Sequence, residues 1–297
     1  MNIAFLACST TLPGAPDRRA DAFEHDQQMA ALVAALRPGE QVSDIDWQAP
    51  LDAFAGFDAV LIGTPWDYWD NREAFLAKLD AIAALGVLVC NAPDVVRWNI
   101  DKGYLGELGA RGVATIPTLL LDNPGRDEII AAFDHFGCDR VIAKRRVGAG
   151  ADGQFDFMRE RPPAADWRMG HAALVQPFLP GIIEEGEHSL IFIDGAFSHG
   201  LIKRPAPGDY RVQSLYGGWD TAVTPAAADL AAAQAVIAGL PFPAPLYARI
   251  DLVRGPEGGL LLMEAELIEP FLYPLQGPEL GPRLLAGLRR KLTASAP

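Results

Sequence analysis

The sequence predicts an α/β fold for the first third of the chain and an α+β arrangement for the rest. Over residues 1–95 short apolar runs alternate with helical periodicity, which is typical of an open, largely parallel sheet. After Pro117 the runs shorten and follow one another closely, as in antiparallel sheets. The 297 residues are enough for more than one core. We expect three lobes, over residues 1–95, 96–182 and 183–297.

The first lobe is expected to contain four strands and two helices. The strands are short buried-type runs, and the helices show apolar residues every three or four positions. The expected strands are Asn2–Cys8, Val42–Trp47, Ala59–Gly63 and Val87–Cys90, and the expected helices are Ala20–Leu36 and Glu73–Leu85.

The second lobe begins with an expected helix over Trp98–Arg111, whose first turn carries Lys102 and which Gly112 closes. A glycine-rich loop over residues 148–153 lies between the last two strands of this lobe. The elements after the first helix are strand Thr118–Leu121, helix Arg126–Phe136, and strands Arg140–Ala143 and Ala173–Gln176.

The third lobe is expected to hold a mainly antiparallel sheet. Asp194-Gly195 is a strong hairpin signal, because both residue types tolerate the positive φ of a tight turn. The expected strands are Leu190–Ile193, Ala196–Lys203, Leu246–Val253 and Gly259–Glu266, and the expected helices are Ala226–Ala238 and Leu280–Leu292.

Composition narrows the possible partners. The net charge is −13, from 25 Lys+Arg and 38 Asp+Glu, which argues against general nucleic-acid binding. Cys8, Cys90 and Cys138 show no CxxC spacing, and no run approaches the roughly eighteen apolar residues of a membrane span. The first residues read as a strand and not as a signal peptide. We expect a cytoplasmic protein with neither a nucleic-acid nor a membrane partner.

Three carboxylates protrude from two strand-like runs near the end of the chain. Alternation along a strand places Glu264 and Glu266 on one face, and Asp251 joins them if its strand is the neighbour. Such a cluster repels itself unless a cation lies within it. Mg²⁺ prefers oxygen ligands and typically bridges carboxylates to substrate phosphates. The pattern therefore points to nucleotide chemistry.

A lysine and a glycine loop supply a second phosphate signal. Lys144 ends an apparent strand and precedes Gly148-Ala-Gly-Ala-Asp-Gly153. Glycine lets the backbone present N–H groups to phosphate, and lysine adds a compact positive charge. The spacing is neither a Walker A motif nor a GxGxxG fingerprint. Alone, such a loop is more often only a turn.

In their order along the chain, these motifs resemble the ATP-grasp superfamily, and within it the glutathione-synthetase-like carboxylate–amine ligases. Asp101-Lys102 before the segment 112–118 is similar to the first ATP lysine and the segment that follows it, with Ala114 where a proline is usual. The resemblance implies an ATP-grasp fold, with an N-terminal α/β lobe and two α+β lobes enclosing ATP. The nucleotide contacts that it implies are Lys102, Lys144, Gly148, Gly150, Gln176, Phe178, Leu179 and Glu187.

The same resemblance implies roles for other charged residues. Arg249 matches the phosphate-binding arginine, while Arg204 and Arg211 match the arginines over the acceptor. The implied ligands of Mg²⁺, with two ions expected and Mn²⁺ as an alternative, are Asp251, Glu264 and Glu266. Glu266 stands where an asparagine is commoner. Glu184 and Glu185 lie close to Glu187, so the ribose contact stays open among these three.

A narrower likeness is to the D-cycloserine-synthetase-like branch. The segments that carry it are Pro65-Trp-Asp-Tyr68, Asn91-Ala-Pro93, Arg97–Lys102 and Glu266–Pro270. The branch implies ATP-dependent ring closure between a carboxylate and an amine-type nitrogen.

We therefore expect an ATP- and Mg²⁺-dependent ligase that forms an amide-type bond through an acyl phosphate. Its partners would be small, amino-acid-like carboxylate and amine substrates, with closure within one molecule as one option and a homo-oligomer left open. Two alternatives stand: a peptide- or protein-modifying ligase, and a nucleotide-binding regulatory module without turnover. Purely structural interpretations also stand. Arg249 and Asp251 fit a structural ion pair, and Trp66 fits a side chain that only packs the first lobe.

Overall fold

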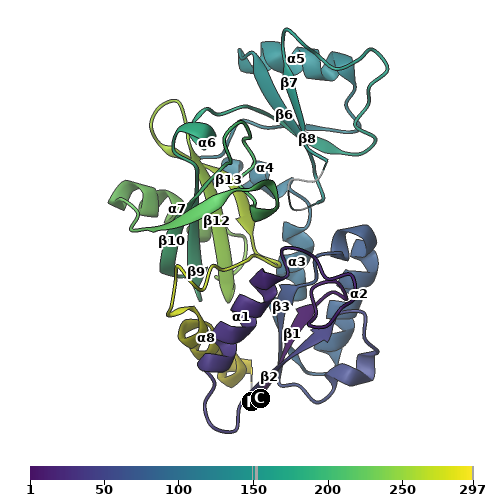
Figure 1. Cartoon of the computed structure of the whole chain (residues 1–297), viewed down its shortest axis with the longest axis vertical. Helices are drawn as coiled ribbons and strands as arrows, with labels where there is room; N and C mark the ends of the chain where they lie inside the picture. Colours follow the sequence, from purple (N-terminus) through teal and green to yellow (C-terminus); the bar gives the residue numbers. More distant parts are fainter. Residues whose placement is uncertain (149, 151–152, 296–297) are drawn as a thin grey trace.

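The computed structural model describes residues 1–148, 150 and 153–295, and arranges them around three sheets (Figure 1). Each sheet comes from one continuous stretch of the chain. The first is wholly parallel and the other two are antiparallel, which confirms the predicted fold class.

The first sheet has the order β2-β1-β3-β4 and is covered on both faces. Along β1, Ile3 and Phe5 pack towards one core while Ala4 and Leu6 pack towards another, so residues 3–6 are all apolar. The strands are β1 (Asn2–Ala7), β2 (Gln41–Asp46), β3 (Ala59–Thr64) and β4 (Leu88–Cys90). The helices are α1 (Phe23–Ala34) and α2 (Arg72–Ala84), with short 3₁₀ turns η1 (Leu51–Phe54) and η2 (Tyr68–Asn71).

The second sheet, at the top of Figure 1, has the order β5-β8-β6-β7. Helix α5 (Arg126–Phe136) covers it and buries Ile129 and Phe133. The strands are β5 (Leu119–Leu121), β6 (Arg140–Arg145), β7 (Phe155–Met158) and β8 (Ala173–Pro177). Strand β7 was not predicted, because the four residues that form it after the glycine loop show no clear alternation of apolar and polar side chains.

The third sheet has the order β11-β10-β9-β12-β13. Asp194 and Gly195 have φ of 51° and 79°, which confirms the predicted hairpin between β9 and β10. The strands are β9 (Glu187–Ile193), β10 (Ala196–Arg204), β11 (Trp219–Val223), β12 (Tyr247–Arg254) and β13 (Leu260–Glu266). The helices are α6 (Gly181–Glu184), α7 (Ala227–Gly239) and α8 (Leu280–Ser295), with a 3₁₀ turn η3 (Ser214–Tyr216). Neither β11 nor α6 was predicted, and α8 returns to pack beside α1 (Figure 1).

The helix expected over Trp98–Arg111 was wrong. The chain forms α3 (Pro93–Asn99) and α4 (Tyr104–Ala110), separated by a turn at residues 101–103. The Asp101 carboxylate accepts a hydrogen bond from the Gly103 N–H at 2.8 Å, and the Lys102 N–H donates to the Arg146 carbonyl at 2.9 Å. These bonds replace the helical pattern, so Lys102 lies on a turn.

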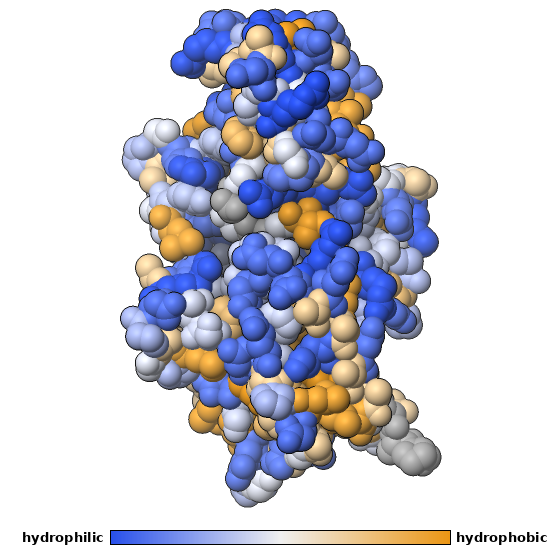
Figure 2. All heavy atoms as spheres, turned by 90° about the vertical axis from the view of Figure 1, so that its right-hand side faces the viewer, coloured by the Kyte–Doolittle hydropathy of each residue, from blue (hydrophilic) through white to orange (hydrophobic). Residues whose placement is uncertain are grey.

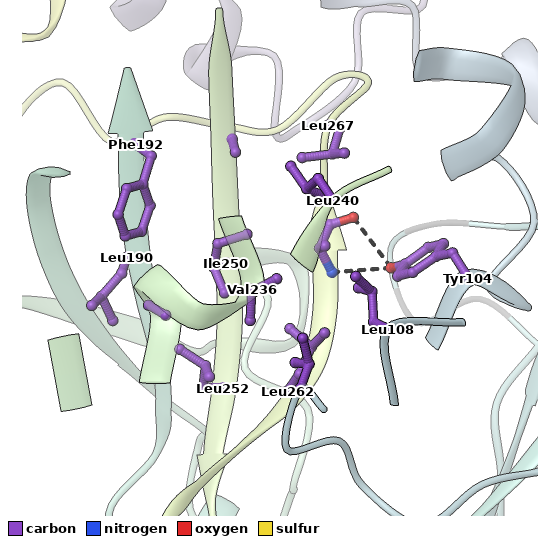
Figure 3. Close-up of a cluster of buried hydrophobic side chains, with 14 of the residues drawn as sticks. Tyr104, Leu108, Leu190, Phe192, Val236, Leu240, Ile250, Leu252, Leu262 and Leu267 are labelled. Carbon is purple, nitrogen blue, oxygen red and sulfur yellow. Dashed lines mark hydrogen bonds between the residues drawn. The ribbon is translucent and has the colours of Figure 1, made fainter. Parts of the chain in front are cut away.

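Strand β13 has β12 on one side and side chains of the α3–α4 region on the other. The Tyr104 hydroxyl donates to the Ala265 carbonyl at 3.2 Å and accepts from the Ala265 N–H at 3.0 Å (Figure 3). The Asn99 amide donates to the same carbonyl at 2.8 Å and accepts from the Leu267 N–H at 3.0 Å. Leu262 also forms a backbone bridge with Thr115, so the outer edge of β13 is hydrogen-bonded to a short backbone segment and to side chains and is not left open.

Hydrophilic residues cover most of the face shown in Figure 2, and apolar residues there form small separate patches. In the part of the chain that the structure describes, the helices are too short or too polar to cross a membrane.

We predict that Tyr104→Phe lowers the free energy of unfolding by about 1–3 kcal/mol, because it removes a buried hydroxyl that serves two backbone groups. Urea unfolding measures the loss. Tyr216→Phe is the matched control: its exposed hydroxyl lies 3.5 Å from the Gly150 carbonyl, and we expect a change within about 0.5 kcal/mol. Equal losses in the two variants would contradict the role given to Tyr104.

Candidate active site

A cavity is lined by residues from all three sheet-forming parts of the chain. The part that forms the parallel sheet supplies the loop before α1, the first turn of α1 and the segment after β3. The part that forms the second sheet supplies the end of β6, and the part that forms the third sheet supplies β9, β10, β12 and β13. The lining includes Arg19, Glu24, Trp66, Tyr68, Lys102, Lys144, Gly148, Gly150, Lys203, Arg249, Asp251, Glu264, Glu266 and Glu269.

The three carboxylates singled out in the sequence lie together on one wall of this cavity. Strands β12 and β13 pair antiparallel, with Asp251 opposite Glu264 and Arg249 opposite Glu266. Alternation along β13 keeps Glu264 and Glu266 on the same face. The structure thus brings together the candidate metal ligands and the candidate phosphate arginine.

Basic side chains lie between these carboxylates. The Arg249 guanidinium donates to Asp251 at 2.9–3.1 Å and also bonds to Glu266. The Lys102 Nζ lies 2.8 Å from the Glu264 Oε1. The Lys203 Nζ bonds to Glu187 and lies 3.6 Å from the Asp251 Oδ1. Each carboxylate on this wall therefore has a basic partner.

The chemistry of this wall fits a magnesium ion, although its carboxylates are now paired with cations. Asp251, Glu264 and Glu266 offer the oxygen donors that Mg²⁺ prefers. Among the described residues, no three metal-ligating side chains are gathered closely enough to hold a metal. The cations that separate them, Lys102 and Arg249, are the groups expected to bind phosphate.

Burial and like charges shift the pKa values of the ionisable side chains on this wall. The pKa of Glu266 is raised to about 8, first because the carboxyl is buried and then because Asp251 and Glu264 lie near it. Arg249 opposes the shift but does not cancel it. Burial lowers the pKa of Lys144, and the nearby Lys102 charge adds to this effect. A bound anion together with its cation would bring both pKa values closer to their ordinary values.

A second, more apolar cavity joins the first. Gln176 is buried there, and its amide donates to the Thr118 hydroxyl at 2.9 Å. The Arg140 guanidinium lies 3.6 Å from the centroid of the Phe178 ring. The residues shared by the two cavities are Lys144, Gln154, Glu187, Gln213 and Met263. Gln176, Phe178 and Leu179, predicted to receive adenine, line this slot, and Lys144 links it to the phosphate wall.

The glycine loop lies beside the first lysine. The Gly148 carbonyl accepts a hydrogen bond from the Lys102 Nζ at 2.6 Å, and Gly148 and Gly150 both line the larger cavity. Residues 149, 151 and 152 of the predicted loop lie outside the described residues. The loop and the first lysine are therefore neighbours, as the ordered motifs suggested.

The two arginines expected over the acceptor are placed differently from each other. Arg211 lines the apolar slot, where its guanidinium bonds to Asp209 at 2.8 Å and lies over the Tyr216 ring. Arg204 lines neither cavity. Successive side chains of a strand point to opposite faces, and the preceding residue, Lys203, is the one that enters the cavity. The alternation of side chains along this strand was the sequence signal that distinguishes Lys203 from Arg204.

Sequence reasoning missed the part of the site that the start of the first lobe supplies. The Glu24 carboxylate accepts a hydrogen bond from the Ser214 hydroxyl at 3.1 Å, and burial raises its pKa to about 7. Burial also raises the pKa of Glu269 to about 7, although Tyr68 is hydrogen-bonded to it. The aromatic Trp66 donates to the Glu269 carbonyl at 3.3 Å. These residues make part of the lining acidic and aromatic. Of Glu24, Glu269 and Trp66, Glu24 lies outside every motif named in the sequence, because it carries no local signal beyond a helical pattern.

An ion pair fixes the position of the first lysine relative to the second. The Arg146 guanidinium donates to both oxygens of Asp101, at 3.0 and 2.9 Å. The Lys102 N–H donates to the Arg146 carbonyl, so two adjacent residues of the turn bind Arg146. Arg146 lies two positions beyond Lys144, just after β6. The pair therefore joins the turn that carries Lys102 to the strand that carries Lys144.

Known proteins resemble this chain in sequence. The sequence family described as D-cycloserine synthetase DcsG, N-terminal domain, matches residues 3–91. The cycloserine biosynthesis protein DcsG of Streptomyces lavendulae is 31% identical over 265 residues, which cover 83% of this chain and 88% of that protein. These matches confirm the narrower resemblance seen in the sequence motifs.

Solved structures confirm the ATP-grasp fold. The crystal structure of D-cycloserine synthetase DcsG has a TM-score of 0.79 at 22% identity and covers 98% of this chain and 100% of its own. The D-alanine–D-alanine ligase of Bacillus anthracis has a TM-score of 0.67 at 14% identity, with 99% and 98% covered. The ATP-grasp ligase PsnB, complexed with a precursor variant, Mg and ADP, has a TM-score of 0.65 at 16% identity, with 97% and 98% covered.

We predict that Arg146→Met weakens ATP binding about ten- to hundredfold, because a displaced Lys102 loses a charge-assisted hydrogen bond to phosphate. The pair itself is partly exposed, at 28% and 41%, so its loss should cost no more than about 1 kcal/mol of stability. Titration calorimetry and urea unfolding measure the two effects. Arg159→Met is the control, since Arg159 pairs with Asp134 in the same lobe but lines neither cavity. Equal affinities in the two variants would refute the positioning role.

A pH dependence follows from the raised pKa of Glu269. Its ordinary value is 4.5 and its folded value about 7, so the folded chain holds the proton more tightly. The contribution of this carboxyl to stability is fully present below about pH 4.5 and is lost as the pH rises through about 7. Glutamine cannot ionise. Between pH 5 and 8, the Tm of Glu269→Gln should fall less than that of the wild type.

The control for this experiment is Glu257→Gln, which changes an exposed carboxylate in the turn between β12 and β13. Its Tm should follow the wild-type curve at every pH. A Glu269→Gln curve parallel to the wild type would mean that Glu269 does not titrate in this range.

Proposed function

The chain belongs to the family of the cycloserine biosynthesis protein DcsG and is an ATP-dependent, ADP-forming carboxylate–amine ligase; we propose that it forms an amide-type bond on a small, amino-acid-like substrate through an acyl phosphate. The observation that carries the proposal is the set of groups that line one cavity. Three cations that suit phosphate, Lys102, Lys144 and Arg249, line it together with two carboxyls of raised pKa, Glu24 and Glu269.

The first step needs an activated carboxylate, because a carboxylate is a poor electrophile. One carboxylate oxygen of the substrate attacks the γ-phosphorus of ATP, the bond to the β–γ bridging oxygen breaks, and ADP leaves. Lys102, Lys144 and Arg249 would stabilise the charge that spreads over the transferring group. Asp251, Glu264 and Glu266 would hold Mg²⁺, which when bound supplies charge neutralisation at the phosphate oxygens.

The second step forms the new bond. The substrate nitrogen attacks the acyl carbon, the carbon–oxygen bond to phosphate breaks, and the nitrogen loses a proton. Glu24 and Glu269 line the same cavity, and with a pKa of about 7 each can accept that proton near neutral pH. When ionised, they would also attract the ammonium group of an amino acid. The aromatic rings of Trp66 and Tyr68 also line the cavity.

Exclusion of water matters because an acyl phosphate hydrolyses readily. The segment that carries η3 bonds to α1 through Ser214 and Glu24, across 190 residues of sequence. It therefore covers the cavity between the first and third lobes. We also propose three lobes at residues 1–95, 96–182 and 183–297, an arrangement supported by the presence of one sheet in each.

Ring closure is one form of this reaction, in which the carboxylate and the nitrogen belong to one molecule. The family relative is a cycloserine biosynthesis protein, which supports closure on an amino acid here. Product analysis by mass spectrometry distinguishes the two forms, because closure of one substrate lowers its mass whereas ligation joins two.

The central test is release of phosphate and ADP from ATP and Mg²⁺ in the presence of a panel of amino acids and their side-chain derivatives. We expect equimolar ADP and phosphate that depend on the substrate. Glu264→Gln should lower kcat at least about a hundredfold, because it removes a charge at the phosphate wall. Glu257→Gln, on an exposed turn of the same hairpin, should keep wild-type kcat. A fully active Glu264→Gln would refute the metal-binding role, and no substrate-dependent release would favour a regulatory module.

A further inference from the structure

Gln213 lies at the junction between the two cavities and lines both of them. It precedes η3, in the segment that closes over the site. Lys144 and Glu187 line the same junction, one from β6 and one from β9. A molecule that fills both cavities must pass this glutamine.

The side chain of Gln213 has an unused hydrogen-bonding atom. Its Oε1 is buried and has no hydrogen-bond partner within residues 1–148, 150 and 153–295. A buried acceptor without a donor is costly, so such atoms usually meet a ligand or water. The junction is therefore prepared for a donor that the described residues do not provide.

The chemistry of ATP identifies that donor. With the base in the apolar slot and the phosphates at Lys102, Lys144 and Arg249, the ribose falls at the junction. Between the base and the γ-phosphate, the only hydrogen-bond donors of ATP are the 2′ and 3′ hydroxyls of the ribose. An amide oxygen matches a hydroxyl donor, whereas it repels a phosphate oxygen.

The acidic residue expected to bind ribose is partly engaged. Glu187 is 4% exposed, and its Oε1 bonds to the Lys203 ammonium and lies 3.5 Å from the Ser189 hydroxyl. Each hydroxyl that is taken out of water needs an acceptor, and a ribose has two. Gln213 adds a second acceptor beside Glu187 at the junction.

The backbone around Gln213 is held in place. Its carbonyl accepts hydrogen bonds from the N–H groups of Tyr216 at 3.0 Å and Gly218 at 3.2 Å. A Cβ at Gly218 would lie 2.1 Å from the Val212 carbonyl oxygen, so this turn requires glycine. The hydroxyl of the next residue, Ser214, donates to the Glu24 carboxylate in α1. A contact at Gln213 would therefore also hold the covering segment over the substrate.

We propose that Gln213 accepts a hydrogen bond from a ribose hydroxyl of ATP and makes the enzyme prefer ribonucleotides to deoxyribonucleotides. The inference rests on the proposed function, since it takes ATP as the nucleotide. It adds a specificity-determining residue on the covering segment to the contacts made by the sheets.

The test compares the Kd of ATP, 2′-deoxy-ATP and 3′-deoxy-ATP by titration calorimetry in the presence of Mg²⁺. The wild type should bind ATP about tenfold more tightly than at least one deoxy analogue, as the loss of one buried hydrogen bond requires. Gln213→Leu should bring that ratio to within about twofold of one. Gln213→Glu keeps an acceptor and should keep the preference.

Gln154→Leu is the matched control, because it removes another amide at the same junction. Its Kd values should change alike for ATP and the analogues, leaving the ratio intact. An unchanged ratio in Gln213→Leu, or no preference in the wild type, would overturn the inference. Phosphate release is measured separately, so a protein that binds ATP with this preference but does not turn over would count against the proposed function alone.

Discussion

The active site depends on the outer edge of β13, because this strand carries two of the three candidate metal ligands and has a full strand partner on one side only. A short backbone bridge from Thr115 to Leu262 and a set of side chains complete the edge. Tyr104 and Asn99 bond to the backbone of Ala265 and Leu267, and the Asn91 amide donates to the Leu267 carbonyl at 2.6 Å. The Asn91 side chain also accepts a hydrogen bond from the Leu246 N–H and donates one to the Tyr247 carbonyl. The motifs around Asn91 and Asn99 therefore hold the first lobe and the α3–α4 region against the carboxylate strand.

The carboxylates on that strand are tolerable without ligand only because cations lie among them. Asp251, Lys203 and Arg249 are between 3% and 7% exposed, and burying charges so deeply is costly unless they are paired. Asp251 lies beside two cations, Arg249 and Lys203, which lower its pKa against the effect of burial. Glu266 bonds to Arg249 alone and lies near Asp251 and Glu264, so burial and these like charges raise its pKa. The structural interpretation of Arg249 and Asp251 as an ion pair and their proposed role at a nucleotide site therefore concern the same contact.

The features that were predicted correctly depend only on residues close together in the sequence. Two-residue alternation put Glu264 and Glu266 on one face, and Asp194-Gly195 gave the hairpin, because each depends only on neighbouring residues. The break between α3 and α4 was missed, since Arg146 fixes it from 45 residues away. The edge strands β7 and β11 escaped notice because each is only four or five residues long. Lys203 was passed over for its neighbour because both are basic and only the strand face distinguishes them.

Two kinds of structure line the cavity and place different demands on the chain. The first comprises strands β6, β12 and β13 and the turn at Lys102, where a shift of one residue would exchange the faces of a whole strand. The second comprises the start of α1 and the segments after β3 and β13, where Glu24 and Trp66 lie on helix ends and loops. Loops accept substitution more readily than paired strands. Selectivity for the substrate should therefore be set by these segments, while the strands keep the chemistry constant.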